Sequence, residues 1–307
     1  MNFEKIFAVI VNWNLKDDTI ACLRSLLKAG LFARNIVLVD NGSRDNIVSG
    51  IQTVYPDITI IKNKQNFGFA VANNIGITYA LEQSAEWVFL LNNDTIVAPN
   101  ILAEIQRVHR STQASVYGPQ IRYFDEPERI WYLGDIHIPG TLFTRSLQKD
   151  RLASVTLPDA IPVDFVSGCG ALIHRKVFET VGMFNPTFFM YGEDADLMWR
   201  IRRAGFRIIA VPNAVMWHKV SRSAGKDSPA TRYWKTRNQI RFYRLHTRGA
   251  KRGLMFALST LRAVVFAVKD ILLWRKQLLT PLYYGWADGW WHKENFAEVY
   301  QYGKSSV

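Results

Sequence analysis

Short apolar runs alternate with amphipathic stretches over roughly the first ninety residues of the chain. Residues 6–12 form an unbroken apolar run that ends in a polar residue, as expected for a strand buried on both faces. Residues 16–29 have helical spacing and end before Gly30. Further strands are predicted at 36–39, 58–61 and 87–91, and further helices at 45–54 and 68–83. This alternation predicts a parallel sheet with helices on both faces.

The alternation is lost after residue 94. Residues 125–162 contain several Gly and Pro residues and are predicted to be irregular, as in a lid or an insertion. The other predicted elements are helices at 99–111, 176–181 and 195–203, strands at 115–121 and 207–211, and long helices at 229–247 and 253–277. Residues 165–174 contain a Ser-Gly-Cys-Gly run before three apolar residues. An α/β domain followed by a helical extension is therefore expected.

The composition is that of a globular protein kept in a reducing compartment. The chain has 307 residues, of which 49% are hydrophobic, enough for one large α/β domain or two modest ones. Its two cysteines, Cys22 and Cys169, form no disulfide framework or metal-ligand spacing, which favours a cytoplasmic location. The N-terminus lacks a basic segment followed by a long apolar stretch, so no signal peptide is expected.

The net charge of +12 is concentrated in one segment. Residues 200–280 hold nineteen Lys or Arg against two acids, Asp227 and Asp270, so the rest of the chain is mildly acidic. Such a segment indicates an anionic partner, such as lipid headgroups, pyrophosphate or nucleic acid, or else a solvated basic face.

The predicted helix at 253–277 is apolar on most of its surface. Arg262, Lys269 and Asp270 interrupt it, which does not suit a membrane-spanning helix. It could lie in a membrane interface with basic flanks, or pack on the main domain or on a second copy of the chain. Amphipathicity alone does not separate these alternatives.

Two acidic clusters follow apolar runs, where the carboxyl ends of strands in an open α/β sheet bind ligands. In the first, Asp94 can anchor a divalent metal with Asn92 and Asn93 as neutral helpers, because Mg²⁺ takes few protein carboxylates. In the second, Asp194 is the candidate general base, next to Glu193. Repulsion within this second cluster should raise at least one carboxyl pKa. N-terminal helix capping is the structural alternative.

Several other polar positions could contact a phosphate-activated substrate. Asp40 ends the second strand and could bind a nucleotide base or ribose, or form an Asx-turn. Asn66 and Gly68 precede a helix whose free N–H groups favour an anion. Asn74 and Gly76 are poor helix formers inside that helix, which indicates close packing or ligand contact.

Two positions in the C-terminal part of the chain complete the candidates. His218 follows a strand-like run and could be a metal ligand, a diphosphate contact or a structural histidine. Arg237 lies on a predicted helix where it could face the site or a lipid phosphate.

In this order, the motifs resemble those of family 2 glycosyltransferases of the GT-A fold, especially the bacterial branch with rhamnosyltransferases of cell-surface polysaccharides. The matching segments between residues 6 and 240 are 9–14, 39–43, 66–70 with Asn74 and Gly76, 90–95, 168–171, 192–197 with Arg200 and Gly205, His218, and 237–238. The ordered set is specific, although no single motif is.

The resemblance implies a GT-A domain, a Rossmann-like nucleotide-binding α/β/α sandwich, over residues 1–225. Its nucleotide-sugar half would be 1–98 and its acceptor half 99–225, followed by a basic amphipathic helical extension at 226–307. It also implies a dTDP- or UDP-sugar donor, a divalent metal (Mg²⁺ or Mn²⁺) and an inverting single displacement.

The resemblance also assigns roles to individual residues. Asp194 matches the catalytic base, Asp94 the last acid of the metal-binding triplet, and His218 a metal or diphosphate contact. The nucleotide- and substrate-binding positions would be Asn12, Asp40, Asn66, Gly68, Asn74, Asn92, Asn93, Glu193 and Arg237. The chain departs from the family at Asn92, where the triplet has an acid, and at Asn73, where many relatives have an Arg; the second change leaves a thymidine donor open.

The expected function is transfer of a sugar, with rhamnose from dTDP-rhamnose as one candidate, to a hydroxyl of a glycan or lipid-linked acceptor. The protein would act in the cytoplasm, with peripheral contact to anionic membrane at its inner face, and a homodimer is left open. Alternatives are a catalytically silent scaffold and a nucleic-acid-binding protein, but carboxylates beside the cleft would repel nucleic acid. A nucleotidyltransferase would need a Gly-rich phosphate loop, which residues 12–15 do not provide.

Overall fold

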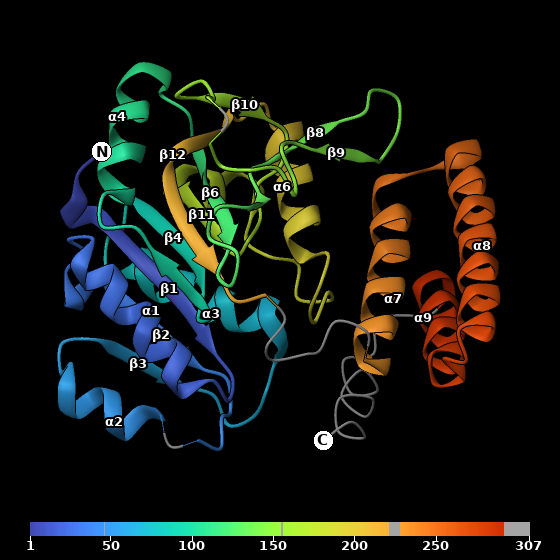
Figure 1. The fold of residues 1–307 in the computed structure, drawn as a ribbon, viewed down its shortest axis with the longest axis horizontal. Helices are drawn as coiled ribbons and strands as arrows, with labels where there is room; N and C mark the ends of the chain where they lie inside the picture. The colour runs from blue at the N-terminus through green and yellow to red at the C-terminus, as the bar shows by residue number, and fades with distance from the viewer. Residues whose placement is uncertain (46, 155, 221–227, 292–307) are drawn as a thin grey trace. The chain divides into compact units, whose positions relative to one another are not determined.

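A computed structural model of the chain describes residues 1–45, 47–154, 156–220 and 228–291 (Figure 1). The chain forms two compact units. The larger unit holds Met1–Phe184 and Leu197–Ser223, and the smaller unit holds Asn185–Asp196 and Ala224–Val307. The boundary predicted between residues 225 and 226 lies outside the described residues, and the predicted division into domains stays a prediction.

A sheet of ten strands forms the centre of the larger unit. Its strands are β1 (Ile6–Asn12), β2 (Ile36–Asp40), β3 (Thr59–Lys62), β4 (Trp87–Asn92), β5 (Thr95–Val97), β6 (Val116–Tyr123), β7 (Ile130–Tyr132), β10 (Ile161–Val163), β11 (Gly170–His174) and β12 (Ile208–His218). Along the sheet the order is β10-β12-β6-β11-β4-β1-β2-β3, with β5 beside β12 and β7 beside β6. A separate hairpin pairs β8 (Asp135–His137) with β9 (Thr144–Ser146).

The α-helices of the described residues agree with most of the predicted ones. They are α1 (Lys16–Lys28), α2 (Ile47–Val54), α3 (Gly68–Glu82), α4 (Ile101–Thr112), α5 (Arg175–Val181), α6 (Glu193–Arg203), α7 (Pro229–His246), α8 (Gly249–Leu272) and α9 (Leu279–Trp291). Short 3₁₀ turns lie at Phe3–Lys5, Ala33–Asn35 and Lys276–Leu278. None of the helices in the described part of the chain has the length and hydropathy needed to cross a membrane.

The sheet is parallel only in part. The pairs β1–β2, β2–β3 and β1–β4 are parallel, as predicted. That prediction covered only about the first ninety residues; beyond them, β11 runs antiparallel to both β4 and β6. A parallel neighbour needs a long crossover connection, usually a helix. The described residues between β6 and β11 contain no helix, so β11 joins the sheet in the opposite direction.

Helices cover both faces of the sheet, which confirms the α/β class (Figure 1). Alternate residues of β1 point into two separate apolar layers. Ile6, Ala8 and Ile10 join the layer formed with α1, α2 and α4. Phe7 and Val9 join the layer formed with α3, α5 and part of α6. Both faces of β1 are therefore buried, which explains its continuous apolar run.

The stretch at 125–162 is more ordered than the sequence predicts. The prediction of an irregular segment is wrong for β7, β8, β9 and the start of β10, which lie within it. Each has three residues, too few to show an alternating pattern. The side chain of Asp135 in β8 accepts hydrogen bonds from Thr144 and Ser146, which fixes the β8–β9 hairpin.

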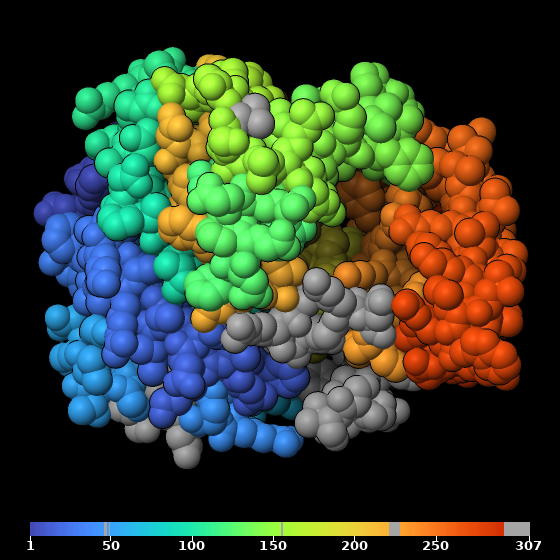
Figure 2. Space-filling view, in the orientation of Figure 1, coloured from blue at the N-terminus to red at the C-terminus, as the bar shows by residue number. Residues whose placement is uncertain are grey.

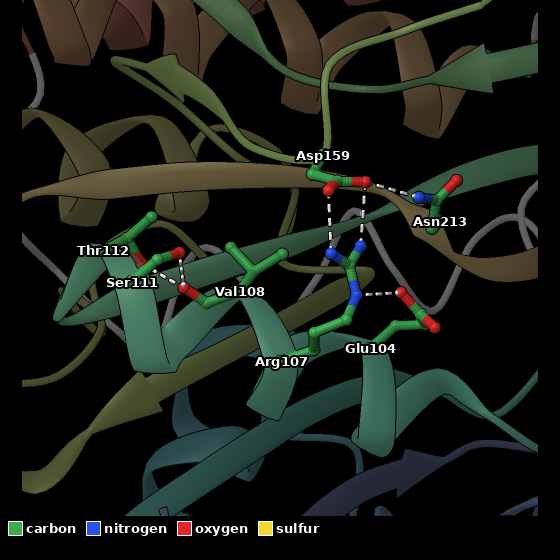
Figure 3. A network of polar contacts seen from close by, with 7 residues as sticks. All are labelled: Glu104, Arg107, Val108, Ser111, Thr112, Asp159 and Asn213. Atoms are coloured by element: carbon green, nitrogen blue, oxygen red, sulfur yellow. Dashed lines mark hydrogen bonds and ion pairs between the residues drawn. The ribbon is translucent and has the colours of Figure 1, made fainter.

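A polar network joins the end of this stretch to α4 (Figure 3). Arg107 contacts both carboxylate oxygens of Asp159 at 2.7 and 2.9 Å and the carboxylate of Glu104 at 3.0 Å. Asp159 also accepts a hydrogen bond from Asn213 in β12. These charges are largely exposed, so we expect the network to fix geometry more than to stabilise the fold.

The smaller unit is built on α7, α8 and α9, with α9 absent from the sequence prediction. Gly285 and Gly289 let α9 approach α7 closely, since a Cβ at either position would lie 2.7 Å from an atom of α7. Tyr233 of α7 also donates a hydrogen bond to Asp288 of α9. The two glycines that permit this packing weaken the helical pattern of the sequence.

Gly76 of α3 packs directly on β1. A Cβ at this position would lie 2.4 Å from Cγ1 of Val9, closer than any real contact. Of the two explanations left open by the sequence, close packing therefore accounts for this glycine.

We expect Gly76→Ala to destabilise the larger unit by about 1–3 kcal/mol, because the added methyl group overpacks the interface between α3 and β1. Thermal unfolding should show a midpoint several degrees lower. Gly50→Ala in α2 is the matched control, because its Cβ would make only an ordinary contact, 3.6 Å from Lys16, and alanine is the better helix former. Equal midpoints for Gly76→Ala and wild type would contradict this packing.

Candidate active site

A network of amides and hydroxyls lies at the carboxyl ends of β1 and β4. Oδ1 of Asn12 accepts hydrogen bonds from Thr19 Oγ1 at 2.7 Å and from Asn93 Nδ2 at 3.0 Å. Nδ2 of Asn12 donates to Ser43 Oγ at 2.8 Å. Asn12, Thr19 and Asn93 are all buried. The sequence predicts Asn12 and Asn93 as neighbouring site residues, and the structure brings them into contact.

The next strand carries Asp40 at its end. One carboxylate oxygen of Asp40 accepts the backbone N–H of Ser43 at 3.1 Å, which is the Asx-turn foreseen as an alternative. Beside it, Asn41 Nδ2 donates to Asn66 Oδ1 at 2.9 Å, and the same oxygen accepts the N–H of Gly68 at 2.8 Å. Gly68 has a positive φ of 83°, which suits glycine at the turn into α3. The loop before α3 is thus fixed by side-chain amides.

Asp94 and His218 meet because β5 pairs with β12. In this antiparallel pair Thr95 lies opposite His218, so the residue just before β5 is brought beside the end of β12. Oδ1 of Asp94 lies 3.1 Å from Nε2 of His218, and each side chain is only 7% exposed. The N–H of Lys219 also donates to the carbonyl of Asp94.

The charge of His218 is stabilised by its neighbours. Burial alone would lower the pKa of His218, but Cys169 and the hydrogen-bonded carboxylate of Asp94 outweigh it and raise the pKa to about 10. The ring of Trp131 packs edge-on against the imidazole, with centroids 4.8 Å apart. This pair is therefore buried and preorganised.

The residues around Asp94 suit a divalent metal with few protein ligands. Oδ1 of Asn92 is buried and has no hydrogen-bond partner in the described part of the chain. A carboxylate, an imidazole and a spare amide oxygen match an ion that completes its shell with water and phosphate oxygens. His218 can be a ligand only as the neutral imidazole, so a metal bound there would displace the proton that Asp94 stabilises. Within the described residues no group of three His, Cys, Asp or Glu side chains is placed to hold a metal.

The second acidic cluster opens α6 in the smaller unit. Tyr191 and Gly192 both have positive φ, 67° and 91°, so the chain turns sharply before Glu193. Nδ2 of Asn238 in α7 donates to the carbonyls of Met190 and Tyr191, both at 2.8 Å. Asn238 is fully buried and therefore fixes the turn that presents the cluster.

The acids of this cluster have different surroundings. Burial, with repulsion from Asp194, holds the pKa of Glu193 well above its usual range, which confirms that one pKa in the cluster is raised. Asp194 is only partly buried, and one of its oxygens accepts the N–H of Ala195. Asp196 is buried, with its carboxylate 2.9 Å from Nε2 of His246. Of the three acids, only Asp194 is partly exposed to solvent.

The profile of glycosyl transferase family 2 matches residues 7–182, more than half of the chain. The chain belongs to this family. This confirms the resemblance noted in the sequence, and the protein is a glycosyltransferase of the α/β GT-A fold.

Sequence relatives in this family carry varied names. The chain is 29% identical over 218 residues to an N-acetylglucosaminyl-diphospho-decaprenol L-rhamnosyltransferase of Mycobacterium tuberculosis, covering 63% of this chain and 69% of that protein. It is 30% identical to the low-salt glycan biosynthesis hexosyltransferase Agl10 of Haloferax volcanii, covering 67% and 64%. It is 23% identical to the dTDP-rhamnosyl transferase RfbF of Shigella flexneri, covering 86% of each.

Solved structures support the fold at low sequence identity. A mannosyltransferase of Pyrobaculum calidifontis, in complex with GDP-Man and Mn²⁺, matches 94% of this chain and 88% of its own, with a TM-score of 0.57 and 14% identity. GalNAc-T7 with UDP, GalNAc and Mn²⁺ matches 78% of this chain with a TM-score of 0.59 and 17% identity. The match covers 47% of the GalNAc-T7 chain, so it spans less than half of that protein.

Two of the predicted substrate contacts of this glycosyltransferase are occupied by contacts within the protein. The side-chain amide of Asn74 both donates to and accepts from the backbone of Phe184, at 2.8 and 3.0 Å. Arg237 is 5% exposed and donates to the carbonyl of Thr187 and to Asn238 Oδ1. Their direct contact with substrate stays a prediction.

Sequence reasoning missed several residues that position the site. Thr19 lies inside α1, where it resembles an ordinary polar helix residue. Asn238 lies inside α7 and belongs to the matching segment 237–238, but nothing in the sequence indicates a positioning role for it. Lys219 forms an ion pair with Asp18 of α1, beside the Asp94–His218 pair. The only signal in the sequence is that Lys219 follows a candidate ligand.

We expect Asn238→Ala to loosen the turn at 188–192, because two buried carbonyls lose their donor at about 1–3 kcal/mol each. Hydrogen exchange of the amides between residues 187 and 196 should become faster, while exchange in the sheet stays unchanged. Asn213→Ala is the matched control, since Asn213 is exposed and donates only to exposed Asp159. Unchanged exchange in Asn238→Ala would contradict the positioning role.

Proposed function

We propose that this family 2 enzyme transfers a sugar from a nucleoside diphosphate to a hydroxyl of a glycan or lipid-linked acceptor, with inversion at the anomeric carbon. The observation that carries the proposal is the buried Asp94–His218 pair. Asn92, two residues before Asp94, also has a buried amide oxygen without a hydrogen-bond partner in the described residues. This set lies one residue from the Asn12–Asn93 network, at the carboxyl ends of parallel strands, where α/β sheets bind nucleotides.

Asp94 and His218, with Asn92, would hold a divalent ion. Bound there, Mg²⁺ or Mn²⁺ stabilises the negative charge that develops on a leaving diphosphate. Two of the solved structures similar to this chain contain Mn²⁺ beside a nucleotide or nucleotide sugar, which supports this assignment. Asp40 and Asn66, at the ends of neighbouring segments, would contact the nucleotide.

Asp194 would act as the general base. The acceptor oxygen attacks the anomeric carbon from the side opposite the diphosphate, the new carbon–oxygen bond forms as the bond to phosphate breaks, and the acceptor proton passes to Asp194. The positive character that develops on the sugar resembles that in glycoside cleavage. Burial raises the pKa of the neighbouring Glu193, which favours its neutral form. Asp94 and Asp194 belong to different units, so their convergence on one bond is part of the proposal.

Rhamnose from dTDP-rhamnose is the favoured donor. Two relatives are named as rhamnosyltransferases, and the name of one of them includes dTDP. A third relative is named as a hexosyltransferase. The name of the mycobacterial relative also contains a diphospho-decaprenol acceptor, which favours a lipid-linked acceptor here. We therefore propose that the protein works in the cytoplasm, at the inner face of the cell membrane.

Asp194→Asn should lower the rate of transfer by at least about 10²–10⁴-fold, because the amide cannot take up the acceptor proton. Binding of dTDP-rhamnose should stay close to that of wild type. Transfer is measured as radiolabelled rhamnose incorporated into acceptor, and binding by calorimetry. Asp57→Asn is the control, since Asp57 is exposed in the turn before β3. Weak donor binding with substantial turnover would refute the role of Asp194.

Asp94→Ala should weaken the Mn²⁺-dependent binding of the donor by at least about 10–100-fold, the loss typical even for residues that only support a metal ligand. Calorimetry with dTDP-rhamnose is run with Mn²⁺ and with EDTA, and Asp57→Ala serves as the control. Equal affinity of wild type and Asp94→Ala in the presence of Mn²⁺ would count against the metal site.

The donor is identified by measuring the thermal unfolding midpoint of wild type with a panel of nucleotide sugars, because a bound nucleotide sugar raises the midpoint.

A further inference from the structure

Two polar residues of helix α8 in the smaller unit, Ser259 and Asp270, face inward. The hydroxyl of Ser259 accepts a hydrogen bond from the indole N–H of Trp290 in α9 at 3.1 Å, and Ser259 is 8% exposed. Asp270 is 1% exposed, and its carboxylate lies 3.2 Å from Nη2 of Arg232 in α7. These contacts fix the rotation of α8 about its own axis.

The opposite face of α8 and the residues after it are apolar and exposed. The exposed fractions of the α8 side chains on this face range from 40% to 72%. This apolar face consists of Leu254, Leu258, Leu261, Val264, Val265, Val268, Ile271 and Leu272, followed by Leu273 and Trp274. In Figure 2 the orange side chains of this segment lie at the molecular surface. Soluble monomers rarely expose a continuous apolar patch of this extent, so it indicates a partner.

The charges around the apolar face are of one sign. Residues 249–276 contain six basic residues, and Asp270 is their only acid. Because Asp270 is buried and paired with Arg232, the charged side chains exposed within residues 249–276 are all positive. The exposed basic side chains include Lys251 and Lys269 on α8 and Lys276 just after it.

We propose that the apolar face docks on a lipid bilayer with anionic headgroups, with α8 lying along the membrane surface. Apolar side chains would enter the headgroup–acyl boundary while the flanking lysines and arginines contact lipid phosphates. Trp274 is 82% exposed, and exposed Tyr283 and Trp291 of α9 add aromatic groups of the kind that favour this boundary. A second copy is disfavoured, because a two-fold contact through this face would bring positive charges together.

This proposal extends the proposed function, because a lipid-linked acceptor would be held at the same surface, but its test needs no substrate. The full-length protein is mixed with vesicles of phosphatidylcholine, with or without phosphatidylglycerol, and floated on a density gradient. We expect wild type to float with the anionic vesicles, and to float less with neutral vesicles or at high salt.

Val265→Glu should lower the partition into anionic vesicles about tenfold, since it removes an apolar side chain from the contact and adds a negative charge. Leu261→Glu/Val265→Glu should lower it further. Val54→Glu is the matched control: Val54 is 60% exposed on α2 of the larger unit, and Val265 is 55% exposed. Both substituted sites are exposed, so the circular dichroism and unfolding midpoint should match wild type.

Three results would overturn the proposal. The first is that wild type fails to float with anionic vesicles at low salt. The second is that Val54→Glu reduces flotation as much as Val265→Glu does. The third is that sedimentation without lipid shows a dimer that Val265→Glu dissociates, which would assign the face to a second copy. Transfer to a detergent-solubilised acceptor is measured in parallel. If Val265→Glu keeps this activity while losing flotation, the docking surface and the chemistry are separate, and failure of either proposal leaves the other standing.

Discussion

The pairing of β5 with β12 is the constraint on which the candidate site depends. Three residue pairs hold the short β5 against the end of β12, and the last of them sets Thr95 opposite His218. Asp94 comes immediately before this pair, so its carboxylate has little freedom except to face the imidazole. A buried carboxylate is unfavourable without a partner, and His218, with its raised pKa, supplies one. Asn92, at the end of β4, has a buried side-chain amide oxygen without a hydrogen-bond partner in the described residues. Local strand pairing thus assembles a donor set from residues more than a hundred positions apart.

Strands buried on both faces could be predicted well from the sequence, and strands with broken patterns could not. The run at 6–12 becomes β1 with the predicted bounds because both its faces must be apolar. The strand predicted at 207–211 instead extends as β12 to His218, with a shift in register between Val211 and Val215. Pro212 lies within this irregularity and ends the apparent run, because proline lacks the N–H that a regular strand donates. The sequence therefore indicates two separate pieces, a strand at 207–211 and a strand-like run before His218, where the structure has one strand.

For the candidate site, the sequence predicts the reactive groups better than the residues that hold them. Asp94 and Asp194 stand out because acids follow apolar runs. The roles of Thr19 and Asn238 do not stand out, since a polar residue within a helix is ordinary until a buried partner is known. Burial also distinguishes neighbouring acids. Glu193 and Asp194 are adjacent in the sequence, yet Glu193 is buried, which raises its pKa well above the usual range, and Asp194 is partly exposed.

The orientation of α8 carries two free-energy costs in water: Asp270 is buried, and apolar side chains are exposed. Burying Asp270 loses its hydration, and pairing it with Arg232 returns only part of that free energy. Turning Leu261 and Val265 outward forgoes the gain from removing apolar surface from water. Docking of this face on a bilayer, as proposed, would remove the second cost, because the apolar side chains would then meet an apolar medium. The buried ion pair would also keep the one acid of residues 249–276 away from anionic headgroups. An amphipathic pattern fits packing on protein as well as docking on a membrane, which is why the sequence alone left these alternatives open.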